Sequence, residues 1–413
     1  MKIVILGGGL AGLSAARELI LNNEVIILEK EDYLGGLASG FEYKCKRIPK
    51  YYHHVFFHDN VTKSLLKEAS LNLTWKKILM GIAANNKIYN FTNLSGFLKF
   101  DYLSFIGKIR YGLFGAYVFF LMNPDKIKDD VNARQWLMKY AGEEVTSKLF
   151  HQLYAVNKFG ISLDEISAKQ FAYRLKAKEA MGKFGYPIKS LDKMIDFLED
   201  QILKKNGKII KKVNIKEIDL KKKEIKYNNE KIKYDILINT IPFPEFIKIS
   251  KNLPENYKNK ISKIKYCPCV SVVFGTREFL SKHYWVNILN ERISMVMQHS
   301  NLFDGYDTKI NWALRYGGSE QDINLNDSEI KKFYFGVVKK YFNNCEIIWS
   351  KVFVEKYASP IYDKNYFLNN PGYKTPVDGL YNAGVSVTYP EIRNMNTALK
   401  SGIKIAKVIK NEL

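Results

Sequence analysis

Residues 3–12, Ile-Val-Ile-Leu-Gly-Gly-Gly-Leu-Ala-Gly, constrain the fold of this chain more than any other stretch. A β-branched apolar run ends in a Gly7-x-Gly9-x-x-Gly12 motif, and the pattern of residues 13–21 predicts a helix. A strand, a glycine turn and a helix in this order are typical of a dinucleotide site, where a pyrophosphate lies on the helix N-terminus. The chain therefore opens with the first unit of an α/β fold.

A second apolar run follows over residues 24–28 and ends in Glu29. In dinucleotide folds an acidic residue about twenty positions beyond the glycines binds a ribose hydroxyl. Glu29 stands at that distance, so the context of the motif supports a nucleotide. A glycine-rich turn in some other α/β unit is the alternative.

The composition is that of a folded protein with a large excess of basic over acidic residues. The chain has 413 residues, of which 46% are hydrophobic and 26% are charged, with a net charge of +22. This length is sufficient for two or three domains. No helix-turn-helix, zinc-finger or RNA-binding signature is present, so we expect a small-molecule substrate and no nucleic acid. The charge is compatible with an anionic substrate or membrane, or with a solvated lysine surface.

The four cysteines and the start of the chain bear on its compartment. Cys45, Cys267, Cys269 and Cys345 are too scattered for a disulfide framework and lack zinc-site spacing. The first predicted strand begins at the second residue, so we expect no secretory signal. A cytoplasmic setting is the simplest interpretation, and no metal is expected.

Strand and helix patterns recur at the start, the middle and the end of the chain. Helices are expected at 61–69, 131–150, 164–180, 190–205, 327–342 and about 394–409, and strands at 208–213, 215–219, 223–227, 236–238, 270–274, 293–298, 309–316 and 346–356. Asn326 followed by Glu329 predicts a capping box. The fold class is α/β: a discontinuous nucleotide domain (1–60, 187–243 and 370–413) and an inserted α+β substrate domain (61–186, mainly helical, and 244–369).

An apolar stretch at 111–122 is too short to span a bilayer, which needs roughly twenty residues. Aromatic residues and the basic Lys99, Lys108 and Arg110 precede it. A buried core helix or the wall of a substrate cavity is the favoured interpretation. The alternative is peripheral contact of residues 97–122 with the inner face of a membrane.

Four parts of the chain resemble the FAD-dependent amine oxidase superfamily, which includes protoporphyrinogen oxidases, phytoene-type desaturases and, more remotely, UDP-galactopyranose mutases. The likeness is strongest at 7–13 with Glu29, at 34–39, at 207–242, and at 380–384 with 393–402. The sequence is most similar to a protoporphyrinogen-oxidase-like branch. The resemblance implies a Rossmann-like FAD-binding domain and an oxidoreductase.

The resemblance also implies which residues hold FAD, including a second glycine pair near the pyrophosphate, a backbone contact of Ile215 with adenine, and a flavin contact at the last helix. The candidate cofactor-binding residues are Gly7, Gly9, Leu10, Ala11, Gly12, Glu29, Lys30, Gly35, Gly36, Leu37, Ile215, Ala383, Gly384, Asn394, Met395 and Asn396. Two positions depart from the family pattern. Leu37 replaces a common arginine, and Val385 replaces a common acid.

Candidate catalytic residues are few, because a flavin carries the redox chemistry while the protein binds and orients. By its order in the chain, His53 or His54 could bind the flavin or an anionic substrate, or move a proton near neutral pH. Arg393 precedes the last helix and could stabilise a reduced, anionic flavin. Histidines on an ordinary strand or loop are the alternative.

Three functions are compatible with these features. The first is an FAD-dependent oxidoreductase of the oxidase, desaturase or dehydrogenase type, acting on a largely apolar or amine-type small molecule. The second is a non-redox flavoenzyme resembling UDP-galactopyranose mutase, acting on a sugar nucleotide. The third is a non-catalytic flavin-fold binding protein at a membrane.

Overall fold

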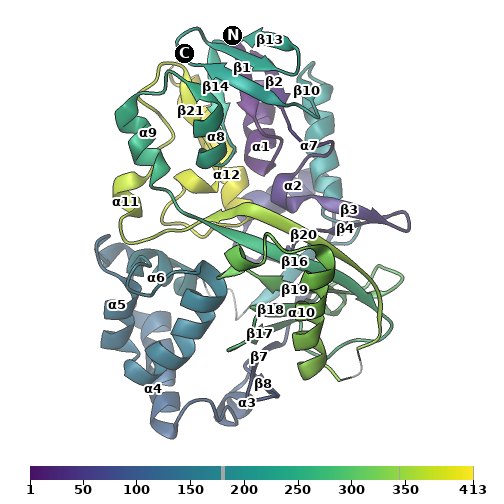
Figure 1. The fold of residues 1–413 in the computed structure, drawn as a ribbon, viewed down its shortest axis with the longest axis vertical. Helices are drawn as coiled ribbons and strands as arrows, with labels where there is room; N and C mark the ends of the chain where they lie inside the picture. The colour runs from purple at the N-terminus through teal and green to yellow at the C-terminus, as the bar shows by residue number, and fades with distance from the viewer. Residues whose placement is uncertain (178–181, 344, 413) are drawn as a thin grey trace.

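A sheet of five parallel strands lies at the end of the molecule that carries both chain termini (Figure 1). The structure is a computed structural model that describes residues 1–177, 182–343 and 345–412. The strand order is β10 (Lys208–Ile210), β2 (Glu24–Leu28), β1 (Lys2–Leu6), β14 (Ile236–Asn239) and β21 (Leu380–Asn382). The strands are nearly continuous apolar runs because both faces of the sheet are covered. The predicted α/β fold is confirmed.

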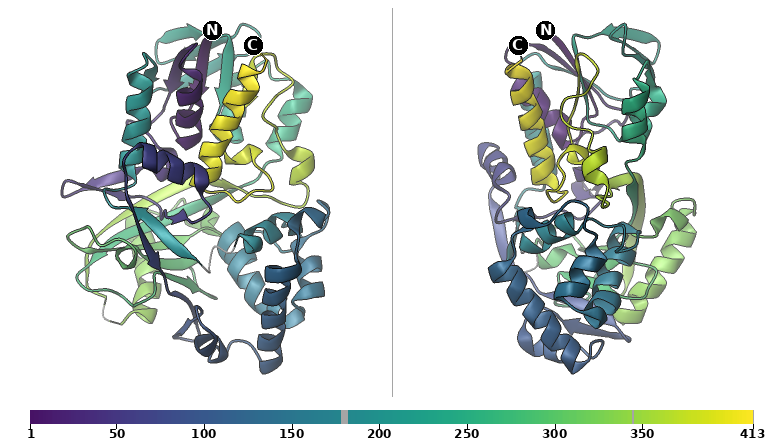
Figure 2. Two further views of the ribbon diagram at one scale, coloured as in Figure 1. Left: turned by 180° about the vertical axis from the view of Figure 1, so that it is seen from behind. Right: turned by 90° about the vertical axis from the view of Figure 1, so that its left-hand side faces the viewer.

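Helices cover one face of this sheet, and a second sheet covers the other (Figures 1 and 2). The helices are α1 (Leu10–Leu19), α7 (Asp192–Leu203) and α12 (Met395–Lys410), with α2 (Asn60–Glu68) against α12. A Cβ atom on Gly402 would lie 2.4 Å from the Ala11 carbonyl oxygen, so this glycine lets α12 approach α1. The opposite face carries β13 (Glu230–Lys233), β12 (Glu224–Tyr227), β11 (Ile215–Asp219) and β15 (Ser250–Lys251), with α8 (Phe243–Ile249) and α9 (Glu255–Ser262).

A seven-stranded sheet forms the middle of the molecule. Its order is β20 (Ile347–Pro360), β16 (Tyr266–Thr276), β19 (Lys309–Arg315), β18 (Met295–Gln298), β17 (Trp285–Ile288), β7 (Met80–Ala84) and β8 (Lys87–Asn90). Helix α10 (Asp327–Tyr341) packs on it and begins with the predicted capping box of Asn326 and Glu329. Two small sheets complete the fold. One pairs β3 (Gly40–Tyr43) with β4 (Lys46–Pro49), and the other has the order β5 (Val55–Phe56), β9 (Lys183–Pro187) and β6 (Leu73–Lys77).

A helical lobe with its own apolar core lies at the other end of the molecule. It contains α3 (Leu94–Leu98), α4 (Phe105–Ala116), the π-helical η2 (Tyr117–Leu121) and η4 (Val145–Phe159), α5 (Ala133–Tyr140) and α6 (Ala168–Lys176). The part of the chain that the structure describes has no helix that is both long and apolar enough to cross a bilayer.

Some predicted elements need correction. The segment 61–186 contains the strands β6, β7 and β8 besides its helices, and β7 pairs with the distant strand β17. The helix expected at 131–150 is divided near Gly142, whose φ of 80° ends α5. The end of the helix expected at 164–180 lies outside the described residues. The strand expected at 208–213 stops at Ile210, since the Val213 amide turns back to the Glu29 carbonyl oxygen at 2.9 Å.

Candidate functional site

The carboxyl ends of the parallel strands bring together three distant parts of the chain. The Gly7 amide donates to the Leu28 carbonyl oxygen at 2.9 Å, and the Thr240 hydroxyl donates to the Leu6 carbonyl oxygen at 2.6 Å. The Ala383 amide donates to the Asn239 carbonyl oxygen at 2.9 Å. Ligands of open parallel sheets bind in the crevice at this edge.

The first glycine turn is closed on one side and open on the other. A Cβ atom on Gly12 would lie 2.1 Å from the Gly7 carbonyl oxygen, whereas one on Gly9 would meet no atom within 4 Å. Helix α1 begins at Leu10, and no side chain caps it and no acidic residue lies in its first turn. The first amides of a helix lack intrahelical partners. The open side at Gly9 and the first amides of α1 therefore suit an anionic group such as a pyrophosphate.

Glu29 is buried beside this turn. Its carboxylate accepts hydrogen bonds from the Gly8 amide at 2.6 Å and from the Glu31 amide at 2.9 Å. A carboxylate has about four acceptor positions, so two are left for ribose hydroxyls. Glu29 thus holds the backbone of the turn as well as being the predicted ribose ligand. Lys30 instead points to Glu245, with 3.5 Å between the charged atoms.

The second glycine pair lies against the first turn. The Gly35 amide donates to the Gly8 carbonyl oxygen at 2.8 Å, and Gly35 has a φ of 100°. His53 Nε2 lies 2.8 Å from the Leu37 carbonyl oxygen, and since a carbonyl only accepts, Nε2 is the donor. Burial lowers the pKa of His53. This histidine fixes the backbone of the second glycine pair, a role that its order in the chain did not reveal.

The carboxyl-terminal segment completes the edge, but its asparagine side chains are already engaged. Asn394 caps α12 by accepting from the Thr397 amide at 2.9 Å. Asn396 accepts from the amides of Val61 and Thr62, at 2.9 and 3.1 Å, at the start of α2. The side-chain oxygens of both asparagines therefore bind other parts of the protein, and the flavin contact expected at this segment stays a prediction.

Two other predicted cofactor positions lie at the same edge. The Gly384 amide donates to the Ser401 hydroxyl at 2.8 Å, and Gly384 has a φ of 103°. Ile215 begins β11, two residues after the Val213 amide that bonds to the Glu29 carbonyl oxygen. The supporting hydroxyls of Thr240 and Ser401 have no sequence signal, because their partners lie far away in the chain.

The guanidinium of Arg393 points into the protein. Its Nη1 donates to the Pro360 carbonyl oxygen, and its guanidinium lies 5.2 Å from the Phe159 ring centroid and 5.1 Å from that of Tyr362. Its buried Nε has no hydrogen-bond partner among the described residues. Burial, and then the positive charge of Arg174, lower the pKa of Arg393 to about 10, so it stays protonated at neutral pH. A buried cation of this kind favours anionic over cationic groups nearby.

His54 lies in an aromatic cluster rather than at a free surface. Its ring is stacked on Phe184 at 4.2 Å, and its Nδ1 lies 3.1 Å from the Tyr284 hydroxyl. Burial lowers the pKa of His54 to about 3. The imidazole is therefore neutral at physiological pH, and we assign it a packing role instead of proton transfer. His58 is exposed.

Acid should destabilise the protein through its buried histidines. Burial also lowers the pKa of His299 to about 3, whereas an unfolded histidine titrates near about 6.5. Between these two pKa values the unfolded chain binds more protons than the folded chain. The free energy of unfolding is therefore highest above about pH 6.5. Below that pH it falls by about 1.4 kcal/mol per pH unit for each such histidine.

Urea unfolding between pH 7 and 5 checks this expectation. His299→Phe should reduce the slope of unfolding free energy against pH by the contribution of one histidine. The substitution breaks no hydrogen bond of the ring, because neither ring nitrogen of His299 has a partner in the described part of the chain. Tyr186→Phe, in the neighbouring ring at 4.4 Å, is the matched control that alters the cluster without removing a histidine. An unchanged slope in His299→Phe would contradict the argument.

In the described ranges, no group of three or more His, Cys, Asp and Glu side chains is arranged to hold a metal ion.

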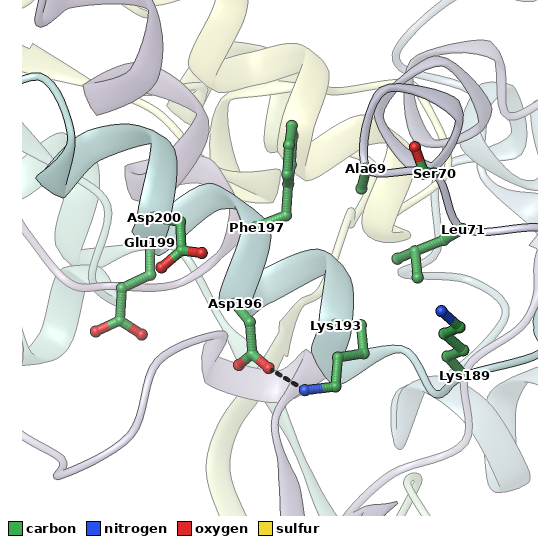
Figure 3. A pocket seen from close by; sticks show the side chains of 9 residues that line it. All are labelled: Ala69, Ser70, Leu71, Lys189, Lys193, Asp196, Phe197, Glu199 and Asp200. Atoms are coloured by element: carbon green, nitrogen blue, oxygen red, sulfur yellow. Dashed lines mark hydrogen bonds and ion pairs between the residues drawn. The ribbon is translucent and has the colours of Figure 1, made fainter.

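A surface hollow of about 570 Å³ lies between the end of α2 and α7 (Figure 3). Its lining includes the ion pair of Lys193 with Asp196 at 3.0 Å, and none of the predicted site residues. The hollow is therefore separate from the sheet edge.

Comparisons with known proteins agree with this geometry. The family described as flavin containing amine oxidoreductase matches residues 10–410. The chain is 23% identical to the 15-cis-phytoene desaturase of Arabidopsis thaliana over 462 aligned positions, covering 97% of this chain and 78% of that protein.

Solved structures share the fold across the whole chain. A candidate protoporphyrinogen oxidase from Exiguobacterium sp. 255-15 superposes with a TM-score of 0.80 at 14% identity, covering 100% of this chain and 99% of that one. A reduced UDP-galactopyranose mutase superposes with a TM-score of 0.78 at 14% identity, covering 100% and 96%. At these identities the likeness concerns the fold alone.

Proposed function

Because the chain belongs to the flavin-containing amine oxidoreductase family, whose cofactor is FAD, we propose that it is an oxidoreductase that transfers hydride at a C–C or C–N bond of a largely apolar small molecule. When bound, FAD supplies the hydride-accepting ring. The observation that carries the proposal is the open space before Gly9, framed by the two glycine turns and the uncapped start of α1.

The chain's own residues bind and orient in this proposal. The first amides of α1 hold the pyrophosphate, and the remaining acceptor positions of Glu29 hold the ribose. His53 keeps the second glycine turn in place through the Leu37 carbonyl oxygen. The N-terminal backbone of α12 provides positive potential for the flavin.

The positive charge of Arg393 bears on whether the substrate is cationic, uncharged or anionic. After burial, the groups that shift its pKa most among the described residues are Arg174, two phenols and a thiol, and none of these is a carboxylate. A protonated amine would be repelled by this cation, whereas an uncharged or anionic substrate would not. We therefore favour an apolar substrate without positive charge over an amine-type one.

Anaerobic reduction of the FAD-loaded protein tests the proposal. Neutral and carboxylated apolar alkenes should bleach the oxidised-flavin absorbance faster than cationic amines of equal size. Arg393→Met should lower the rate ratio of anionic to cationic substrates by about tenfold, or about 1.4 kcal/mol, whereas Arg393→Lys should retain it. A preference for cationic amines would contradict the substrate class, and a protein that retains no flavin would contradict the function.

The sugar-nucleotide alternative has its own support, since a net charge of +22 and the buried Arg393 suit a diphosphate. Incubation of the reduced protein with UDP-galactopyranose separates the two functions, because only a mutase would form the furanose isomer. Slow or absent flavin reduction and reoxidation with every donor would favour the non-catalytic binding protein.

A further inference from the structure

The outer face of the helical lobe carries the most exposed apolar side chains of the described chain. Among large hydrophobic residues, Leu121 is 77% exposed and Phe120 is 75% exposed. We call this surface the apolar tip and define it by its six members above 60% exposure: Leu94, Phe105, Ile106, Leu113, Phe120 and Leu121. Large exposed apolar patches mark interaction surfaces.

The tip cannot be explained by packing within the lobe. Helix α4 and η2 already bury their inner face, where Phe114 and Val118 join the core of the lobe. A surface helix normally pairs one buried apolar stripe with a polar outer face. Here the outer face carries large apolar side chains beside Lys108 and Arg110, which points to a contact outside the protein.

The apolar tip lies on the lobe farthest from the chain termini. Figures 1 and 2 place α3 and α4 at the end of the molecule opposite the chain termini. Together α4 and η2 contain 17 residues, the sum of 12 and 5, which is short of the roughly twenty needed to span a bilayer.

The charged residues beside the apolar tip favour contact with an anionic surface. Residues 94–121 contain Lys99, Lys108 and Arg110 but a single acid, Asp101, which accepts a hydrogen bond from the Tyr89 hydroxyl. The whole chain carries +22. Two copies meeting through this surface would bring like charges together, whereas anionic lipid headgroups would attract them.

We propose that the apolar tip inserts into the interfacial region of a bilayer rich in anionic lipid, with its basic residues at the headgroups. Amphipathic segments with aromatic and aliphatic residues beside lysine and arginine bind in this way. The proposal concerns where the protein docks and does not depend on its redox function.

Vesicle co-sedimentation of the full-length, FAD-loaded protein tests this docking. Binding to phosphatidylglycerol–phosphatidylcholine vesicles should exceed binding to pure phosphatidylcholine at least tenfold and weaken as salt rises. The triple variant Phe105→Ser, Leu113→Ser and Phe120→Ser should bind the phosphatidylglycerol-containing vesicles at least tenfold more weakly than the wild type. The matched control is Leu21→Ser, Phe57→Ser and Leu368→Ser, at positions 68%, 73% and 61% exposed elsewhere, and it should bind like the wild type.

Thermal unfolding and FAD content should be the same in both triple variants, because all six side chains are exposed. Equal binding by the tip variant and the wild type would overturn the proposal, as would wild-type protein that binds neither vesicle. A tip variant that instead converts a dimer to a monomer, measured by light scattering, would identify the surface as a contact between copies and also overturn it.

Discussion

Replacing Gly9 by alanine should weaken FAD binding by about 10- to 100-fold while leaving the flavin-free protein as stable as the wild type. The added methyl group would meet no protein atom within 4 Å, and the Gly9 backbone, at φ −72° and ψ 175°, suits any residue. The methyl would instead occupy the space that we assign to the pyrophosphate. Flavin fluorescence titration and thermal unfolding of the flavin-free protein measure the two effects separately.

Gly12→Ala provides the contrasting result. Its methyl would lie 2.1 Å from the Gly7 carbonyl oxygen, so the turn must shift and both stability and FAD binding should fall. Gly336→Ala, in α10 with no atom within 4 Å of the new methyl, is the control and should bind FAD normally. If Gly9→Ala bound FAD as tightly as the wild type, the pyrophosphate would not lie at this turn.

Asp322→Asn should destabilise the protein by about 3–5 kcal/mol, the usual cost of removing one partner from a buried ion pair. The Asp322 carboxylate is fully buried and lies 2.6 Å from Arg292 Nη2 and 2.9 Å from Arg315 Nη1. It also accepts from the Tyr334 hydroxyl at 3.0 Å, which connects the seven-stranded sheet to α10. Neutralising it would leave two arginines close together without their shared acid.

Chemical denaturation of the variant and of an exposed control measures this effect. Glu346→Gln breaks a surface pair with Arg277, whose side chains are 66% and 69% exposed, and should cost at most about 1 kcal/mol. A loss below about 1 kcal/mol in Asp322→Asn would show that the arginines find other partners, and would contradict the assigned role of the carboxylate.

The local features of this protein could be predicted from the sequence. The Gly7-x-Gly9-x-x-Gly12 turn and the Asn326–Glu329 capping box each depend on residues a few positions apart, and both form as expected. The apolar runs of β1, β2 and β14 form the strands that their patterns predicted. The order of these elements sufficed for the α/β fold and for the family resemblance.

The partners of single side chains were decided by the tertiary structure alone. Asn396 was predicted to contact the flavin, and only the folded chain shows that its side-chain oxygen also accepts from the amide of Val61, which lies 335 residues earlier at the start of α2. His53 or His54 was predicted to bind the flavin or an anionic substrate, or to move a proton. The folded chain packs His54 against Phe184 and Tyr284, and this burial makes its charged form unfavourable. The physical reason is range: turns and caps depend on backbone geometry within a few residues, whereas burial and electrostatics depend on neighbours that only the folded chain assembles.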